Sequence, residues 1–171
     1  PAGGWMGNFI KVRDGCGWCG PSWPYTTGIA IDAIGIQSKK HGHCYDKQFA
    51  YFLKEYSLQH FRDRNINKPY LVEHYNAETG EPLSDEPDYN HSFYIDLIVS
   101  HVAGVSITEE GVSFDPVDVG LDYFILSNLI IRGDNYTITY KRAGYSGSKI
   151  PEIDEIPAGY NVYKNGVKMD I

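Results

Sequence analysis

The spacing of apolar residues predicts three amphipathic helices in the first two thirds of the chain. Residues that cap helix N-termini well, at Thr26 or Thr27, Asp46 and Ser92, mark the expected starts, and Gly104 marks the end of the third helix. Between these marks, apolar and aromatic residues recur three or four positions apart, as along one face of a helix. The predicted inner faces are Ile29, Ala30, Ala33 and Ile34 in the first helix, Phe49, Phe52, Leu53, Tyr56 and His60 in the second, and Ile95, Ile98, Val99 and Val102 in the third.

From residue 105 the pattern takes the shorter period of β-strands. Strands are predicted over residues 111–114, 123–131, 136–141 and 160–171. Turns are expected at residues 133–135 and at Asn165-Gly166, a pair typical of a type I′ hairpin. The proline-containing stretch 150–157 is either an edge strand or a tether. Because helices precede strands instead of alternating with them, the sequence predicts a mixed, segregated α-then-β fold with a small antiparallel β-domain.

Two segments without a period interrupt this pattern. Residues 1–25 are rich in Gly, Trp and Pro, and residues 69–89 are rich in carboxylates, Pro and Gly. Loops of this length usually pack against the fold or carry function. Three amphipathic helices do not easily close a core alone. We therefore expect residues 1–104 to be a helical region, residues 105–171 to be a β-rich appendage, and the whole to be the C-terminal end of something larger.

Composition and charge exclude several classes of function. The 171 residues are 42% hydrophobic and 22% charged, as in a globular protein. The net charge is −7, with 22 acidic against 15 basic residues, so neither nucleic acid nor an anionic membrane is an expected partner. No apolar run approaches the roughly 20 residues that span a bilayer. The 14 tyrosines and 3 tryptophans instead suit binding of flat, polar ligands such as sugars.

The cysteines and the first residue do not identify the cellular compartment of the protein. Three cysteines cannot all pair within one chain, so a disulfide scaffold is not expected. The chain begins with Pro1 instead of Met, so we expect a processed or truncated N-terminus. Phosphate-loop and dinucleotide motifs are absent from the sequence, and no cofactor is expected.

Three short segments contain candidate catalytic or binding residues. Glu73 lies between apolar and polar residues, where a carboxylate at a pocket mouth can act as a general base; the alternative is a solvated loop acid. Trp23 and Tyr25 flank Pro24 before the first helix and offer aromatic platforms to a sugar, unless Trp23 fills the core. Tyr89 and His91 precede the third helix, whose N-terminal amides attract oxygen ligands, or they belong to a plain capping segment.

Two metal sites are possible alternatives. Cys16 and Cys19 form a CxxC pair, and His41, His43 and Cys44 follow further along the chain, which together could form a Cys/His zinc site. The His-x-His-Cys half is not a usual zinc knuckle, however. The acidic loop between residues 78 and 88 could bind Ca²⁺, but it lacks the acidic spacing and central glycine of an EF-hand. We therefore expect no metal.

Three motifs occur in a recognisable order: Gly-Pro-Ser-Trp-Pro at residues 20–24, Val-Glu-His-Tyr-Asn-Ala-Glu-Thr-Gly-Glu at residues 72–81, and Tyr-Asn-His-Ser at residues 89–92. In type, order and spacing they resemble the last third of the catalytic domain of α/α-toroid glycoside hydrolases. This group includes glycoside hydrolase family 63, the trehalases and mannosylglycerate-hydrolase-like domains. The later strands resemble the small β-domain that follows the toroid in many bacterial members. The resemblance implies that this chain supplies the last helical hairpins of an (α/α)6 toroid.

The resemblance also implies roles for individual residues. Glu73 would be the general base that activates water for inverting hydrolysis of an O-glycosidic bond. An oligosaccharide or glycoside would be held by the three motifs and their neighbours, at Gly20, Pro21, Trp23, Trp18, Tyr25, His74, Tyr89 and His91. In these families the general acid is an Asp upstream of the first motif. Here Asp14 lies too close to that motif to match, so the isolated chain is expected to be inactive.

Other classes of function remain as alternatives. A non-catalytic carbohydrate-binding module would share the aromatic platform without needing two carboxylates. A zinc-dependent interaction domain would use the cysteines and histidines described above. If the chain is a fragment, its exposed apolar helix faces are expected to pack against the upstream part of the same enzyme or against a second copy.

Overall fold

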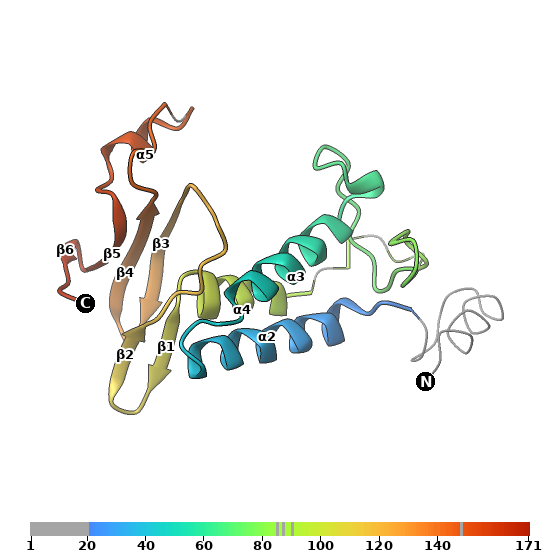
Figure 1. The fold of residues 1–171 in the computed structure, drawn as a ribbon, viewed down its shortest axis with the longest axis horizontal. Coiled ribbons are helices and arrows are strands. Elements are labelled where there is room, and N and C mark those ends of the chain that lie inside the picture. Colours follow the sequence, from blue (N-terminus) through green and yellow to red (C-terminus); the bar gives the residue numbers. More distant parts are fainter. Residues whose placement is uncertain (1–20, 85, 87, 90, 148) are drawn as a thin grey trace.

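Three helical segments lie side by side, and a β-sheet lies at one end of them (Figure 1). The computed structural model describes residues 21–84, 86, 88, 89, 91–147 and 149–171. The helices are α2 (Pro24–Lys40), α3 (Asp46–Gln59) and α4 (Phe93–Leu97), and α4 continues as the π-helix η2 (Ile98–Val102). The chain between α3 and α4 contains the short 3-10 helix η1 (Arg62–Arg64) and gathers at the end opposite the sheet (Figure 1).

The second helix matches its predicted apolar pattern, whereas the first helix does not. In α2 the predicted inner residues Ile29, Ala30 and Ala33 are exposed and Ile34 is half-buried, because the packed side is formed by Gly28, Ile31, Gly35 and Ser38.

The predicted caps of both helices also differ from the structure. α2 begins at Pro24, because proline suits the first helical position, and the predicted start at Thr26 or Thr27 is wrong. The Thr26 hydroxyl donates to the carbonyl of Trp23 instead of capping the helix. α3 begins at Asp46 itself, so this residue lies in the first turn and not at the N-cap. Its inner face is as predicted, except that Phe52 is exposed.

The face of the third helix differs from the prediction. Its buried residues are Leu97, His101 and Val102, whereas Ile95 is 57% exposed. The predicted face assumed a regular α-helical period through residue 102. The wider turn of η2 changes that period from Ile98 onward. Ile95 lies before η2, in α4, where Leu97 is the buried residue instead.

α2 packs closely along α4 and η2 because glycines line the contact. A Cβ atom on Gly28 would lie 2.6 Å from the Phe93 ring, and one on Gly35 would lie 2.5 Å from the His101 ring. Polar groups fix the same contact. His101 Nε2 lies 2.7 Å from an Asp32 carboxylate oxygen, and Lys39 Nζ donates to the Ser100 carbonyl over 2.7 Å.

The β region consists of a hairpin and a four-stranded antiparallel sheet. The hairpin pairs β1 (Val105–Thr108), which was not predicted, with β2 (Gly111–Phe114). The sheet has the order β3 (Tyr123–Ile131), β4 (Asp134–Lys141), β5 (Gly159–Lys164) and β6 (Val167–Lys168). Helices therefore precede an antiparallel sheet, as predicted.

The connections between the sheet strands are tight. Ile131 pairs with Asp134, so the first turn is Arg132-Gly133, one residue earlier than predicted. The hairpin at Asn165-Gly166 is confirmed, and both residues have the positive φ that a type I′ turn requires (51° and 81°). The proline-containing stretch forms a short helix, α5 (Pro151–Glu155), instead of an edge strand or a tether.

Two apolar clusters meet between the helices and the sheet. One is formed by α2, α3, α4 and η2 and includes Val117, which lies between the hairpin and the sheet. The other is formed by β1, β3, β4 and β5 around Ile138 and Val162. Phe124 packs against both clusters, so the sheet and the helices share one contact surface. In the described part of the chain, none of the helices has the length and apolar character needed to cross a membrane.

Candidate functional site

Glu73 lies in a turn that is fixed by a buried tyrosine. Tyr75 is fully buried, and its hydroxyl accepts a hydrogen bond from the Val72 amide and donates one to the Tyr70 carbonyl, each over 3.1 Å. The turn is therefore tied at both ends to one side chain. The Glu73 side chain remains 32% exposed and can reach solvent.

The segment before α2 is paired with this turn. The amide of Ser22 donates to the carbonyl of Tyr75 over 2.8 Å, and the amide of Tyr75 donates back to Ser22 over 2.9 Å. Gln59, at the end of α3, donates to the Ser22 hydroxyl over 3.0 Å. Two motifs that are about fifty residues apart in the sequence are thus joined by backbone hydrogen bonds at the N-terminal end of α2.

This pairing places Trp23 on His74. Their ring centroids are 4.7 Å apart, and the planes are inclined by 27°, so the rings stack. His74 is buried, with 2% of its side chain exposed, and its Nδ1 lies 3.8 Å from Glu73 Oε2. Neither His74 nitrogen has a hydrogen-bond partner among the described residues. Stacking and the nearby Glu73 carboxylate, more than hydrogen bonds, therefore hold His74 in place.

A surface cleft of about 460 Å³ lies near this turn and contains three more of the predicted residues. Tyr25, Tyr89 and His91 line the cleft together with Asp88, Ser92 and Phe93. The rings of Tyr89 and His91 are 5.0 Å apart, and both tyrosines are exposed. These aromatic edges are accessible to a ligand, because they come from the starts of α2 and α4, at the end of the molecule away from the sheet (Figure 1).

His91 connects the cleft electrostatically with the turn that carries Glu73. Burial lowers the pKa of His91, and this outweighs the opposing effects of the backbone at Val72 and of the Glu73 backbone and carboxylate. His91 is therefore mainly neutral at neutral pH. His91 thus contributes no full positive charge beside the Glu73 carboxylate.

Residues 9–92, just under half of the chain, match the family model described as the mannosylglycerate hydrolase MGH1-like glycoside hydrolase domain. The match supports a glycoside hydrolase-like family. It includes the Ser22–Trp23 segment, the Glu73 turn and the cleft residues up to His91. The later strands lie outside the match.

The fold as a whole is similar to that of a solved sialidase. The structures superimpose with a TM-score of 0.69 at 21% sequence identity, over 90% of this chain. The matched region is 14% of the sialidase chain, so this chain spans a small part of that protein's length. At this identity the likeness shows the fold alone. No curated protein sequence is significantly similar to the chain.

The remaining predicted residues lie in different settings. Pro21 is buried beside the Ser22–Tyr75 pairing. Trp18, Gly20 and the two cysteines of the CxxC pair lie outside the described residues. Cys44 is an exposed free cysteine, and the described residues contain no group of three or more His, Cys, Asp or Glu side chains placed to hold a metal.

Sequence reasoning missed two residues that position the site, Tyr75 and Gln59. Tyr75 belongs to the second motif, but its buried hydroxyl gave no signal of its own. Gln59 lies at the end of the predicted second helix, where a polar residue is ordinary. Tyr75 acts through hydrogen bonds to backbone groups of its own segment, and Gln59 acts through a hydrogen bond to Ser22, which is far away in the sequence. A periodic pattern reveals neither kind of bond.

Proposed function

We propose that this chain is the C-terminal part of an inverting α/α-toroid glycoside hydrolase and carries its general base, Glu73. The observation that supports the proposal most is the pairing of Ser22 with Tyr75. It joins the tryptophan motif and the carboxylate motif at one end of the helices, and both motifs lie within the family match.

In the proposed reaction, Glu73 accepts a proton from the water that attacks the anomeric carbon. The geometry supports this role, because the carboxylate is partly exposed and its turn is fixed by the Tyr75 hydrogen bonds. A fixed carboxylate keeps its oxygen aligned with the attacking water, which is the main requirement for a general base.

The sugar would lie against the aromatic side chains around the turn. Trp23 is held by its stack on His74, and Tyr25, Tyr89 and His91 line the adjoining cleft. Pyranose rings have an apolar C–H face that packs on aromatic rings and hydroxyls that bond to polar edges. This arrangement supports a glycoside or oligosaccharide as the substrate class.

An inverting glycosidase also needs a general acid, about 6.5–9.5 Å from the base across the scissile bond. The resemblance assigns this acid to an Asp upstream of residue 20, so we propose that it is supplied by a preceding part of the intact protein. The isolated chain then binds sugar weakly and does not hydrolyse it.

The decisive test is Glu73→Gln in the full-length protein, assayed for hydrolysis against a panel of glycosides. Loss of the base should lower kcat by roughly 100- to 10,000-fold while ligand binding persists. Glu78→Gln is the matched control, since Glu78 is an exposed acid in the same loop and should keep normal kcat. A near-normal kcat for Glu73→Gln, with an unchanged pH profile, would overturn the assignment.

The alternative, a carbohydrate-binding module, is favoured by one observation, the exposed Tyr25 and Tyr89 in a cleft that does not include Glu73. A module would bind sugar equally well with Glu73→Ala, and the full-length protein would show no hydrolysis at all. The same panel of glycosides therefore separates the two functions.

A further inference from the structure

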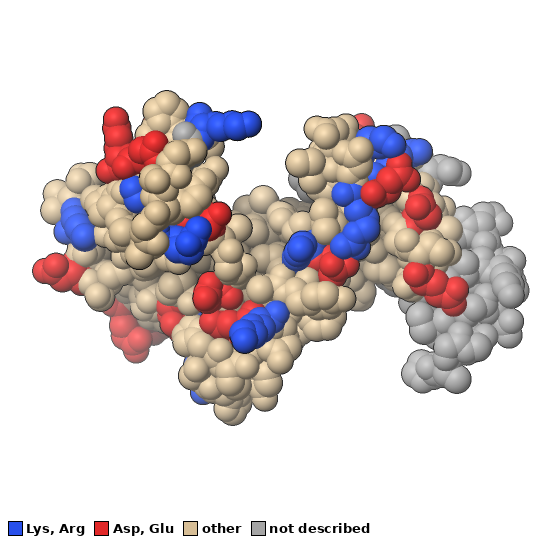
Figure 2. Space-filling view, turned by 45° about the horizontal axis from the view of Figure 1, so that its top comes forward, with Lys and Arg blue, Asp and Glu red and all other residues tan. Residues whose placement is uncertain are grey.

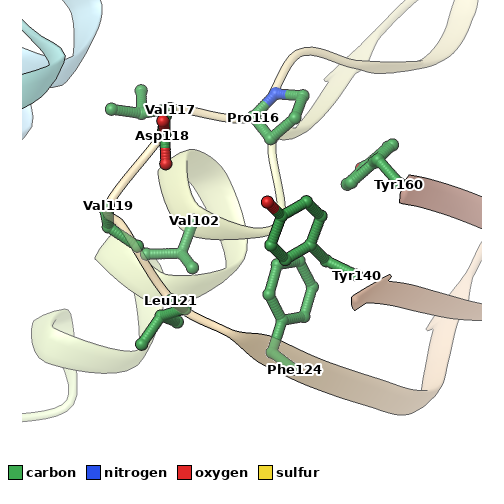
Figure 3. Close-up of a pocket in the computed structure, with 9 residues that line it drawn as sticks. All are labelled: Val102, Pro116, Val117, Asp118, Val119, Leu121, Phe124, Tyr140 and Tyr160. Carbon is green, nitrogen blue, oxygen red and sulfur yellow. The ribbon is translucent and has the colours of Figure 1, made fainter. Parts of the chain in front are cut away.

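A second cavity lies between the helices and the sheet, at the end of the molecule away from Glu73. The segment 116–121 leads from the hairpin to β3 and passes over one face of the sheet, beside the end of η2 (Figure 3). We call the space beneath it the interlayer cavity, defined by Val102, Val117, Asp118, Phe124, Tyr140 and Tyr160. Its volume is about 240 Å³.

The walls of the interlayer cavity are aromatic and its floor is apolar. The Phe124 ring stacks on Tyr140 with centroids 6.0 Å apart and meets Tyr160 at 6.5 Å. The Tyr160 hydroxyl donates to the Ala103 carbonyl over 2.6 Å, which fixes that ring. Val102 and Val117 are 5% and 2% exposed and close the floor. The site is thus preformed by side chains that other contacts already hold.

Two polar groups border this apolar space. The Tyr140 hydroxyl points toward the region enclosed by segment 116–121 and the sheet, and Asp118 lies on that segment at the border of the cavity (Figure 3). In the described part of the chain the Tyr140 hydroxyl has no hydrogen-bond partner. Asp118 is held by two bonds: its backbone amide donates to Asp46 Oδ2 over 3.0 Å, and its side-chain Oδ1 accepts from the Gly120 amide over 2.9 Å.

Charge and size limit the ligand. The cavity is lined by one carboxylate and by no lysine or arginine of the described chain, so phosphates and sugar acids are disfavoured. An apolar cavity of about 150 Å³ accepts a benzene ring, and drug-sized ligands need about 300 Å³ or more. A cavity of about 240 Å³ therefore fits a single six-membered ring with substituents.

We propose that the interlayer cavity binds one neutral pyranose unit. Its C–H face would pack on the aromatic wall, and its hydroxyls would bond to Asp118 and to the Tyr140 hydroxyl. α2 has 17 residues and spans about 25 Å between the Glu73 end and this end of the helices. A sugar bound here is therefore held apart from the proposed cleavage site and would anchor a chain or a product.

The inference does not depend on Glu73, and its test is a binding measurement. Methyl α- and β-pyranosides of glucose, mannose and galactose would be titrated into the full-length protein carrying Glu73→Gln, which removes turnover. Crystals soaked in the tightest-binding glycoside would show whether density occupies the interlayer cavity. We expect density for the glycoside in the interlayer cavity, in addition to any density beside Trp23.

Two conservative variants test the polar contacts. Tyr140→Phe keeps the ring that packs on Phe124, and Asp118→Asn keeps the acceptor for the Gly120 amide, so both should fold. Each is expected to weaken binding at this cavity about 3- to 10-fold, as loss of one hydrogen bond does. Tyr163→Phe is the control, since Tyr163 lies on the opposite face of β5 from Tyr160 and should bind normally.

The outcomes distinguish this proposal from the proposed function. Normal hydrolysis by Tyr140→Phe with weaker glycoside binding would support a separate sugar site. Unchanged binding in both variants, or an interlayer cavity without density in every soak, would overturn it. Intact turnover in Glu73→Gln would instead overturn the catalytic assignment and leave the binding result standing.

Discussion

Gly104 is the residue where one added methyl group should disturb the contact between helices and sheet most. It has φ of +73°, and a Cβ atom here would lie 2.3 Å from the Pro116 nitrogen and 2.5 Å from the Asp115 carbonyl carbon. Both contacts are with backbone atoms, which cannot rotate away as a side chain can. The hydrogen bond from the Asp115 amide to the Gly104 carbonyl (2.8 Å) would also be strained. The change to test is Gly104→Ala.

The cost of Gly104→Ala has two parts that can be separated. The left-handed backbone costs an L-residue about 1–2 kcal/mol, and overpacking against fixed atoms costs about 1–3 kcal/mol more. Gly120 is a matched control, because its φ is +71° and a Cβ atom there would meet nothing within 4 Å. Gly120→Ala should therefore show the backbone cost alone.

The measurement is the free energy of unfolding of both variants, from denaturant titration of the same protein. Gly104→Ala should be less stable than Gly120→Ala by about 1–3 kcal/mol, or by roughly 2–12 °C in Tm for a domain of this size. The smaller entropy of the unfolded chain, which favours Ala over Gly, is common to both variants and cancels. Equal stability of the two variants would refute the argument that a Cβ atom at residue 104 clashes with the Pro116 backbone.

Two further predictions concern His43 and Tyr75. The ring nitrogens of His43 lie 3.2 Å from Asp46 and 3.0 Å from Asp115, and although burial lowers its pKa, these carboxylates outweigh burial and raise it. The stabilisation by His43, at most about 1 kcal/mol for such partly exposed pairs, should be complete below pH 6.5 and disappear as pH rises through the raised pKa. The stability difference between wild type and His43→Asn, followed from pH 5 to 8, checks this sign; a difference that grows with pH contradicts it. Tyr75→Phe leaves the buried Val72 amide without its acceptor and should cost about 1–3 kcal/mol, and in the full-length protein it should lower kcat more than it changes KM. An unchanged kcat would show that the Tyr75 hydroxyl does not position Glu73.

The comparison with His43→Asn is needed because other histidines make the pH dependence of stability run in the opposite direction. Burial lowers the pKa of His60, His91 and His101, so these residues are neutral when folded and take up protons on unfolding in acid. Their contribution to stability falls as pH drops below about 6.5. Wild-type stability alone would therefore mix two opposite trends, and only the difference between the two proteins isolates His43.

The apolar pattern predicted the inner face of one regular helix but not that of the other. In α2 the packed side is formed largely by Gly28, Gly35 and Ser38, which have no large apolar side chain, so the pattern pointed to the exposed side. The inner face of α3 follows from spacing, because Phe49, Leu53 and Tyr56 are buried at helical intervals. The third helix was predicted less well: Ile95 of α4 is exposed although it belongs to the predicted face, and η2 changes the period after Leu97. Figure 2 shows basic and acidic side chains interspersed on one face of the molecule.

The sequence named candidate residues for the site but did not reveal how they are arranged. Motif order identified Trp23 and Glu73, but their proximity depends on the Ser22–Tyr75 backbone pairing, which leaves no periodic signal. The stack of Trp23 on His74 likewise depends on where two loops meet. The interlayer cavity arises from segment 116–121, whose sequence shows neither helix nor strand period, so only the fold reveals it.

The distribution of side chains on α2 bears on the proposal of a larger protein. Two of its three charged residues, Asp32 and Lys39, are bonded to His101 and Ser100 on the packed side of the helix, and the third, Lys40, is exposed at its C-terminal end. Its apolar residues Tyr25, Ile29 and Ile36 are instead 41–58% exposed. A surface helix normally has the reverse arrangement, and a helix that is apolar on more than one side is typical of burial between two layers. This pattern supports our proposal that the outer face of α2 is covered by upstream helices of the same enzyme, which would also bring the general acid toward Glu73.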